Sequence, residues 1–275
     1  AIDSDGISSV TVNGKYANVY SDGTFSTSIS AKENITVIAK DKKGLSSTKS
    51  FTMAVTQPVI TDNNDNNNTK TTQKRLALVI GNGNYTGAGA LKNPVNDARS
   101  MKVALEELGF DVLKHENCDQ RTMKRAIDEF GKELANYDIG FFFYAGHGLQ
   151  VKGANYLIPV DAQLQNENDV EYDCVRADRI MAKMETANVK TNIIVLDACR
   201  NNPFERSWAR STNGNGLAFM NAPQGSLIAY ATAPGNTAAD GQGNNGLYTS
   251  SLLKHIKTPN LSIESVFKKV RQDVI

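Results

Sequence analysis

The chain has 275 residues, 40% hydrophobic and 21% charged, so it is long enough for one large domain or two unequal domains with a buried core. Its 30 Lys and Arg residues nearly balance its 29 Asp and Glu residues, which argues against a nucleic acid or an anionic membrane as partner. No apolar run approaches the roughly 18 residues that a membrane span requires.

Residues 1–57 have the pattern of a small all-β domain. Short runs of alternating apolar and polar residues are separated by turn dipeptides, namely Asn13-Gly14, Asp22-Gly23 and Lys43-Gly44. We therefore expect an immunoglobulin-like β-sandwich whose inner face includes Ile35, Val37 and Ala39. A complete sandwich of this type has about 100 residues, so one or two strands are expected upstream of Ala1.

An Asn-rich stretch, residues 58–74, has almost no apolar side chains to bury, so we expect a flexible linker there. A β-domain on such a tether is typical of exported bacterial proteins. We therefore expect a secreted or periplasmic location, with a cytoplasmic one as the alternative, and the β-domain is expected to position the protein or to recruit a partner. The chain starts at Ala1 without a Met, which leaves open a removed signal peptide.

From residue 75 to residue 275 the pattern changes to alternating strands and helices. A continuous apolar run at 76–81 suits a strand buried on both faces, and helical spacing follows through Val95, Met101 and Leu105. Further strands are expected at 110–115, 138–146, 192–199 and 225–233, and further helices at 122–135, 177–187 and 262–275. This alternation predicts an α/β domain with a mostly parallel sheet between helices. The last helix reaches the end of the sequence, so a C-terminal portion is expected to be missing.

Two reactive residues are predicted at the carboxyl ends of strands, where active sites of such folds gather. His147 follows the apolar run FFFYAG, and Cys199 ends the run NIIVLDAC. A thiol becomes a nucleophile when an imidazole takes its proton and backbone N–H groups stabilise the oxyanion. Gly148 and Cys199 are the expected N–H donors. Taken alone, a Cys at a strand end is more often a small buried residue, and a lone His is more often a polar loop residue. Their occurrence together at strand ends of one domain favours catalysis.

The other cysteines, Cys118 and Cys174, form no CxxC motif with each other or with Cys199, so neither a disulfide framework nor a zinc cluster is predicted. Both are expected to be structural thiols. The remaining histidines, His115 and His255, are expected to be surface or packing residues.

These residues lie in motifs that resemble a known family. The segments VIGNGNY, LKNPVNDA, FYAGHG and IIVLDACRNNP, in this order, are similar to those of caspase-like cysteine peptidases of family C14, in the bacterial branch near metacaspases and paracaspases. Caspases also carry a His about 50 residues before the Cys. The resemblance implies a caspase-like three-layer sandwich, with Cys199 as nucleophile and His147 as general base and acid.

The primary specificity pocket is expected to be acidic. Caspases that cleave after Asp have Gln-Ala-Cys, whereas this chain has Asp197-Ala198-Cys199. A carboxylate there would repel an acidic side chain and pair with Arg or Lys. The resemblance places Asp97 and Asp240 in the same pocket. Compensation of a helix N-terminus is the structural alternative for Asp97, and a solvated loop acid is the alternative for Asp240.

No cofactor is expected to be required. The acidic stretch with Asp161, Asp169, Glu171 and Asp173 offers oxygen ligands, and some metacaspases are activated by calcium, but the spacing fits no EF-hand loop. A solvated acidic loop is the favoured interpretation. A calcium site including Asp169 and Asp173 is the alternative.

The resulting hypothesis is a cysteine endopeptidase zymogen that cleaves protein or peptide substrates after Arg or Lys and activates itself by cleavage after Arg206 or Arg210, in the polar loop after the nucleophile. Two alternatives remain. One is a catalytically silent caspase-like scaffold, and the other is an Asn- or Gly-specific hydrolase or transpeptidase that uses the same Cys and His.

Overall fold

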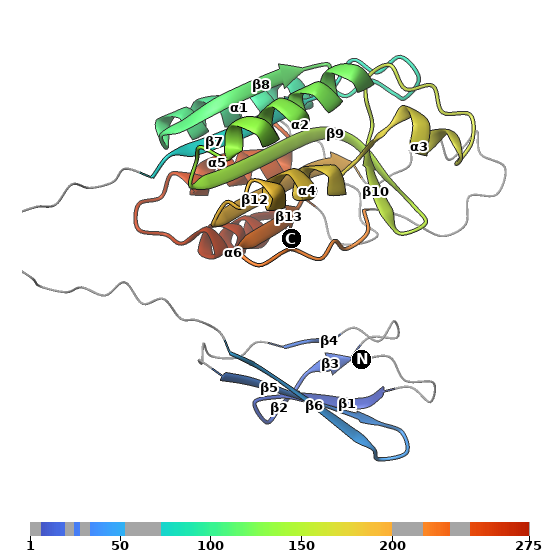
Figure 1. Cartoon of the computed structure of the whole chain (residues 1–275), viewed down its shortest axis with the longest axis vertical. Helices are drawn as coiled ribbons and strands as arrows, with labels where there is room; N and C mark the ends of the chain where they lie inside the picture. The colour runs from blue at the N-terminus through green and yellow to red at the C-terminus, as the bar shows by residue number, and fades with distance from the viewer. Residues whose placement is uncertain are drawn as a thin grey trace, which may run out of the picture. The chain divides into compact units, whose positions relative to one another are not determined.

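The computed structural model describes residues 7–19, 25–27, 34–52, 73–199, 217–231 and 243–274. They belong to two structural units, Ala1–Thr69 and Lys70–Ile275 (Figure 1). Most of the predicted linker, residues 58–74, lies outside the described residues, and so does the predicted turn at Asp22-Gly23.

The first unit contains short antiparallel strands, as its alternating pattern predicts. They are β1 (Ile7–Val12), β2 (Lys15–Tyr16), β3 (Asn18–Val19), β4 (Phe25–Ser26), β5 (Asn34–Asp41) and β6 (Ser46–Thr52). One sheet has the order β2-β1-β5-β6, and β3 pairs with β4. Both residues of the predicted turn at Asn13-Gly14 have positive φ, 49° and 81°, as a two-residue hairpin requires. The small all-β character is confirmed, while the immunoglobulin-like assignment stays a prediction.

Burial in this unit is concentrated on β1, where Val10 and Val12 are almost inaccessible. The predicted inner-face residues Ile35, Val37 and Ala39 on β5 are only partly buried, as are the residues between them. The one-sided pattern expected for β5 is therefore less sharp in the described strands than the sequence suggests.

The second unit is an α/β sandwich around a sheet that has seven strands among the described residues. Its strands are β7 (Arg75–Gly81), β8 (Phe110–Glu116), β9 (Ile139–Val151), β10 (Ala154–Leu157), β11 (Val175–Arg176), β12 (Thr191–Cys199) and β13 (Ser226–Tyr230). Its helices are α1 (Pro94–Glu107), α2 (Gln120–Leu134), α3 (Asp169–Asp173), α4 (Asp178–Thr186), α5 (Leu247–Ile256) and α6 (Ile263–Val274). Strands β8, β7, β9, β12 and β13 are parallel and adjacent in that order, whereas β10 is antiparallel to both β9 and β11. The predicted fold class is confirmed.

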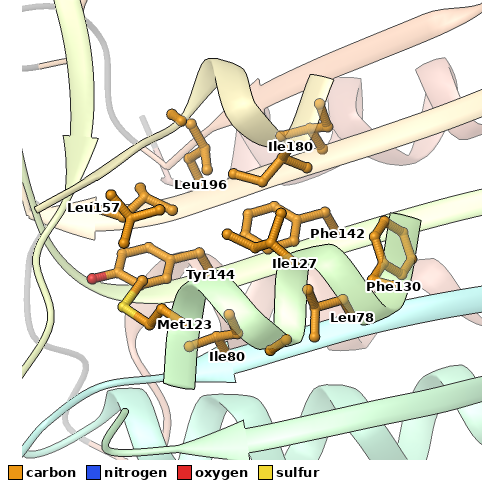
Figure 2. Close-up of a cluster of buried hydrophobic side chains, with 14 of the residues drawn as sticks. Leu78, Ile80, Met123, Ile127, Phe130, Phe142, Tyr144, Leu157, Ile180 and Leu196 are labelled. Atoms are coloured by element: carbon orange, nitrogen blue, oxygen red, sulfur yellow. The ribbon is translucent and has the colours of Figure 1, made fainter. Parts of the chain in front are cut away.

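Helices cover both faces of this sheet (Figure 1). Side chains at alternate strand positions enter two apolar clusters, since neighbouring residues of a strand point to opposite faces. Phe142 and Tyr144 pack with α2 and α4, and Figure 2 shows this cluster. Phe141 and Phe143 pack with α1, α5 and α6. The continuous apolar run of β9 is therefore buried on both sides, as is the predicted run at 76–81 in β7.

Individual residues determine where helices α1 and α2 begin and where α1 ends. Pro94 occupies the first turn of α1, where its missing N–H costs no hydrogen bond. The Asp119 side chain accepts a hydrogen bond from the Thr122 backbone N–H at 2.7 Å and so caps α2. Gly109, with a φ of 78°, follows the end of α1 and turns the chain into β8.

Strand β9 differs from its prediction, because it does not end at Gly146. It continues to Val151, turns at Lys152 and Gly153, both with positive φ, and returns as β10. His147 therefore lies inside a long strand rather than just after one. The reason is a change of partner: β7 pairs with β9 as far as Ala145, and β10 takes over from Gly148 onwards.

Candidate active site

Strands β9 and β12 bring the two predicted catalytic residues together where their parallel pairing ends. The strands are parallel and adjacent, and their register makes His147 and Cys199 direct Cα partners. Cys199 is the last residue of β12. A pairing over nine consecutive positions fixes this register, so it does not depend on the ends alone.

The His147 imidazole is buried, with 7% of the residue exposed, and its Nε2 atom lies 2.7 Å from the carbonyl oxygen of Gly89. A carbonyl can only accept, so Nε2 carries the proton of the neutral ring and Nδ1 is the basic nitrogen. Nδ1 is buried and has no hydrogen-bond partner among the described residues. Burial lowers the pKa of His147 below its usual 6.5, and the bond to Gly89 opposes part of this effect. The ring can therefore accept a proton at Nδ1.

The backbone of Gly148 is oriented toward the β12 side of β9. The His147 carbonyl accepts a hydrogen bond from the Ile158 N–H at 3.1 Å, so His147 directs its backbone groups to the β10 side. Backbone groups of successive strand residues point to opposite sides. The next N–H, that of Gly148, therefore points toward the strand that ends in Cys199. A Cβ atom at Gly148 would lie 3.1 Å from the Cβ atom of Ala198, which is a tight contact.

Two of the three predicted pocket acids, Asp97 and Asp197, accept hydrogen bonds from residues at the start of α5. Asp97 on α1, almost fully buried, accepts hydrogen bonds through Oδ1 from the Gly246 N–H and from the Asn245 side chain, both at 2.9 Å. Asp197 on β12 accepts a hydrogen bond from the Thr249 hydroxyl at 2.6 Å. A Cβ atom placed on Gly246 would lie 3.3 Å from Oδ2 of Asp97 and 3.8 Å from Oδ2 of Asp197. Gly246 thus lies against both carboxylates.

This arrangement raises the pKa of the Asp197 carboxyl to about 7. Burial is the main cause and the charge of Asp97 adds to it, whereas the hydrogen bonds from Thr249 act in the opposite direction. A cation bound beside these carboxylates would favour the ionised form of Asp197. Asp97 also lies in the first turn of α1, where its negative charge can stabilise the partial positive charge of the helix N-terminus. The structural alternative given for Asp97 therefore applies as well.

Several predicted residues lie outside the described part of the chain: Asp240, Arg206 and Arg210. Asp169, proposed as a calcium ligand, accepts backbone hydrogen bonds from Gln165 and Asn166 and so closes a turn before α3. Among the described residues no group of three or more His, Cys, Asp or Glu side chains is arranged to hold a metal ion. In that part of the chain no helix is long and apolar enough to cross a membrane.

Gly89, Tyr85 and the start of α5 also contribute to the site, although the sequence pattern does not assign them a role. Tyr85 belongs to the motif VIGNGNY, and its ring lies 4.5 Å from the His147 ring, between centroids. Gly89 and Gly246 contribute through backbone atoms, which leave little trace in the pattern of side chains.

Comparison with known proteins gives two family matches and several relatives. Residues 74–275 match the caspase domain (Peptidase_C14), and residues 1–57 match domain B of glucodextranase. Mucosa-associated lymphoid tissue lymphoma translocation protein 1 of Homo sapiens is 26% identical over 184 residues, covering 66% of this chain and 21% of that protein. Caspase-1 of Rattus norvegicus is 26% identical over 232 residues, covering 73% of this chain and 53% of the relative.

The chain thus spans about a fifth of the first relative and about half of the second. The caspase-domain match covers the whole of the α/β unit that contains His147 and Cys199, from its first strand to its last helix. The chain belongs to the caspase-domain family of cysteine-type endopeptidases (Peptidase_C14).

Proposed function

We propose that this protein cleaves protein chains after Arg or Lys, with Cys199 as the nucleophile and His147 as the general base and acid. The observation that carries the proposal is the β9–β12 register, which pairs His147 of β9 with Cys199 at the carboxyl end of β12. The hydrogen bond from His147 Nε2 to Gly89 supports the same roles, because it leaves Nδ1 as the proton acceptor.

In the proposed reaction the Cys199 thiol gives its proton to Nδ1 of His147 and its sulfur attacks the scissile carbonyl carbon. The tetrahedral intermediate collapses as the imidazolium protonates the leaving amine, which leaves a thioester on Cys199. Water, deprotonated by His147, then attacks the thioester, and the thiol is regenerated as the acid product leaves. Each proton taken by His147 is returned within the same half-reaction.

We assign the oxyanion hole to the N–H groups of Gly148 and Cys199. The orientation of the Gly148 N–H toward the β12 side supports this assignment, because the oxyanion forms beside the end of β12. Because these donors are already oriented before the reaction, no free energy is spent on reorganising them when the negative charge develops.

The preference for Arg or Lys rests on Asp97 and Asp197. Both carboxylates lie against Gly246, and burial, with a contribution from the charge of Asp97, raises the pKa of Asp197. A guanidinium or ammonium group bound beside them would stabilise their ionised forms. An acidic substrate side chain would be repelled there, and a neutral Asn or Gly would gain no ion pair. Asp240 is proposed as a third member of the pocket.

The test compares fluorogenic peptides that differ only in the residue before the cut: Arg, Lys, Asp or Asn. Wild type, Cys199→Ala and the control Cys174→Ala are assayed with and without calcium. Cys174 is buried and burial raises its pKa to about 12, so its loss should not affect catalysis. Cleavage after Arg and Lys that only Cys199→Ala abolishes supports the proposal. Cleavage after Asp or Asn contradicts the acidic pocket, and no cleavage in any condition favours the scaffold alternative.

We also propose self-cleavage after Arg206 or Arg210 as the activating step. Incubation of wild type, Cys199→Ala and the double variant Arg206→Ala/Arg210→Ala is followed by intact-mass measurement of the fragments. Fragments that require Cys199 and disappear in the double variant support the step. Unchanged fragments in the double variant contradict it. The secreted or periplasmic location and the partner of the β-domain stay predictions.

A further inference from the structure

Two tyrosine hydroxyls hold both backbone polar groups of His147. The His147 N–H donates to the Tyr85 hydroxyl at 2.8 Å, and the Tyr144 hydroxyl donates to the His147 carbonyl at 2.7 Å. The two hydroxyl oxygens are 3.3 Å apart. Tyr85 comes from the loop after β7 and Tyr144 from β9 itself, so the contact ties the loop to the strand.

The donors and acceptors close into a ring. A backbone N–H only donates and a carbonyl only accepts. The Tyr85 hydroxyl oxygen therefore accepts the hydrogen bond from the His147 N–H, and the Tyr144 hydroxyl donates its hydrogen bond to the His147 carbonyl. The Tyr85 proton can then bridge to the Tyr144 oxygen. The Tyr144 hydroxyl also lies 3.1 Å from the Ile158 carbonyl, which connects the ring to the end of β10. Hydrogen bonds in such a closed, buried set polarise and strengthen one another.

Both tyrosines of this hydrogen-bonded ring are buried. Tyr144 is fully buried and 8% of Tyr85 is exposed. Burial also raises the pKa of the Tyr144 hydroxyl well above its usual range, so it stays a proton donor. The Tyr85 side chain in addition packs against the imidazole of His147, with the two ring planes inclined by 55°. Tyr85 therefore contacts both the backbone and the side chain of His147.

The residue before His147 fits this arrangement only as glycine. A Cβ atom at Gly146 would lie 2.5 Å from the Tyr85 hydroxyl oxygen and 2.7 Å from that of Tyr144. Both contacts are too short for any side chain. The hydroxyl pair thus packs directly on the backbone that carries the imidazole.

We propose that Tyr85 and Tyr144 are positioning residues that hold His147 at the angle needed for proton transfer with Cys199. The inference rests on the proposed function, because it assigns that reaction to His147. A misplacement of about 1 Å at a reacting group can lower the rate about 100-fold. Loss of either hydroxyl should therefore slow chemistry more than it weakens substrate binding.

The test uses Tyr85→Phe and Tyr144→Phe, which keep the rings and remove the hydroxyls. Tyr137→Phe is the matched control, because its hydroxyl donates to Asp111 at 2.9 Å near the opposite ends of the strands. We expect kcat on an Arg peptide to fall about tenfold or more in both variants, with KM changed less than about twofold. The control should keep both constants. Wild-type kcat in Tyr85→Phe and Tyr144→Phe would overturn the proposal.

A second readout separates this proposal from the proposed function. The rate of Cys199 alkylation by iodoacetamide is measured against pH for the tyrosine variants and for His147→Ala, with Cys199→Ala as background. We expect slower alkylation near neutral pH in both tyrosine variants and in His147→Ala. If only His147→Ala is slow, the dyad stands and the tyrosine proposal is wrong. If none of them is slow, the His147–Cys199 assignment is wrong as well.

Folding of each variant is checked by urea unfolding, because a buried hydroxyl can contribute about 1 to 3 kcal/mol. Tyr85→Leu serves as a second variant, since it also removes the ring that packs on the imidazole. If Tyr85→Phe does not fold, Tyr144→Phe carries the test with the same expected loss of kcat. A folded Tyr85→Leu variant with wild-type kcat would overturn the role of Tyr85.

Discussion

The carbonyl oxygen of Gly89 lies 2.7 Å from Nε2 of His147 and determines which nitrogen of the ring carries the proton. Gly89 belongs to the loop between β7 and α1, whereas His147 lies on β9. A backbone atom therefore does what a carboxylate side chain does in other catalytic arrangements, namely orient the imidazole and select its tautomer. Because a carbonyl is uncharged, it compensates only part of the effect of burial on the imidazolium form.

This balance leads to a prediction for the pH dependence of the thiol. Burial lowers the pKa of His147 below 6.5, so the ring stays neutral, and able to accept a proton, until the pH falls below that value. We expect the rate of Cys199 alkylation by iodoacetamide to fall on the acid side with a midpoint below pH 6.5. His147→Ala should lose this acid limb. A His147-dependent midpoint above 6.5 would mean that the imidazole is not desolvated as the structure shows.

A second pH effect concerns stability. The pKa of Asp197 is raised to about 7 in the folded state, whereas an unfolded Asp titrates near about 4. Between these values the folded state binds more protons than the unfolded state, so this residue makes stability fall as the pH rises through that window. Asp197→Asn removes the effect and keeps an oxygen that can accept from Thr249. We expect the variant to gain stability relative to wild type between about pH 4 and about pH 8.5.

The measurement is the difference in free energy of unfolding between Asp197→Asn and wild type, from urea unfolding at both pH values. Effects of pH on groups that do not interact with Asp197 cancel in this difference. The same difference at both pH values, or a larger loss for the variant at high pH, would contradict the raised pKa of Asp197.

Much of the α/β fold could be predicted from the sequence, because strands β7 and β9 are buried on both faces. The apolar run of β7 and the stretch FFFYAG of β9 have few other interpretations at their lengths. His147 and Cys199 could be found because each follows such a run directly. Their pairing needed only the assumption that the two strands are neighbours, which the register confirms.

The contacts around these residues could not be predicted in the same way. The turn at Lys152-Gly153 lies between apolar residues and is the sequence signal of the β9–β10 hairpin, which the strand predicted at 138–146 does not include. The hydrogen bonds from Gly246 to Asp97 and from His147 to Tyr85 join residues far apart in the sequence and involve backbone N–H groups. Every residue except proline has such a group, so the sequence gives no sign of which ones are used.

The aromatic centre of the sheet provides a prediction for folding. Phe142 is fully buried between β9 and helices α2 and α4 (Figure 2). Phe142→Ala removes most of a large side chain from a close-packed cluster, and we expect the free energy of unfolding to fall by about 3 to 5 kcal/mol. Urea unfolding measures the change. Val103→Ala, at a position on α1 that is 54% exposed, is the control and should change stability by about 0.5 kcal/mol or less. Similar losses in the two variants would contradict the packing.

The space beside Asp97 and Asp197 can be narrowed by a substitution that removes neither carboxylate. Gly246 has a φ of −60° and a ψ of 155°, values that alanine adopts without strain, and its added Cβ would lie 3.3 Å from Oδ2 of Asp97. If a substrate Arg or Lys binds here, Gly246→Ala should raise KM for an Arg peptide about tenfold or more, because the methyl group competes for that space. Cys199 alkylation should stay at the wild-type rate, since His147 is untouched. Gly243→Ala, where an added Cβ meets no atom of the described residues within 4 Å, is the matched control. An unchanged KM in Gly246→Ala would mean that the basic side chain binds elsewhere and that Asp97 and Asp197 serve to hold the start of α5.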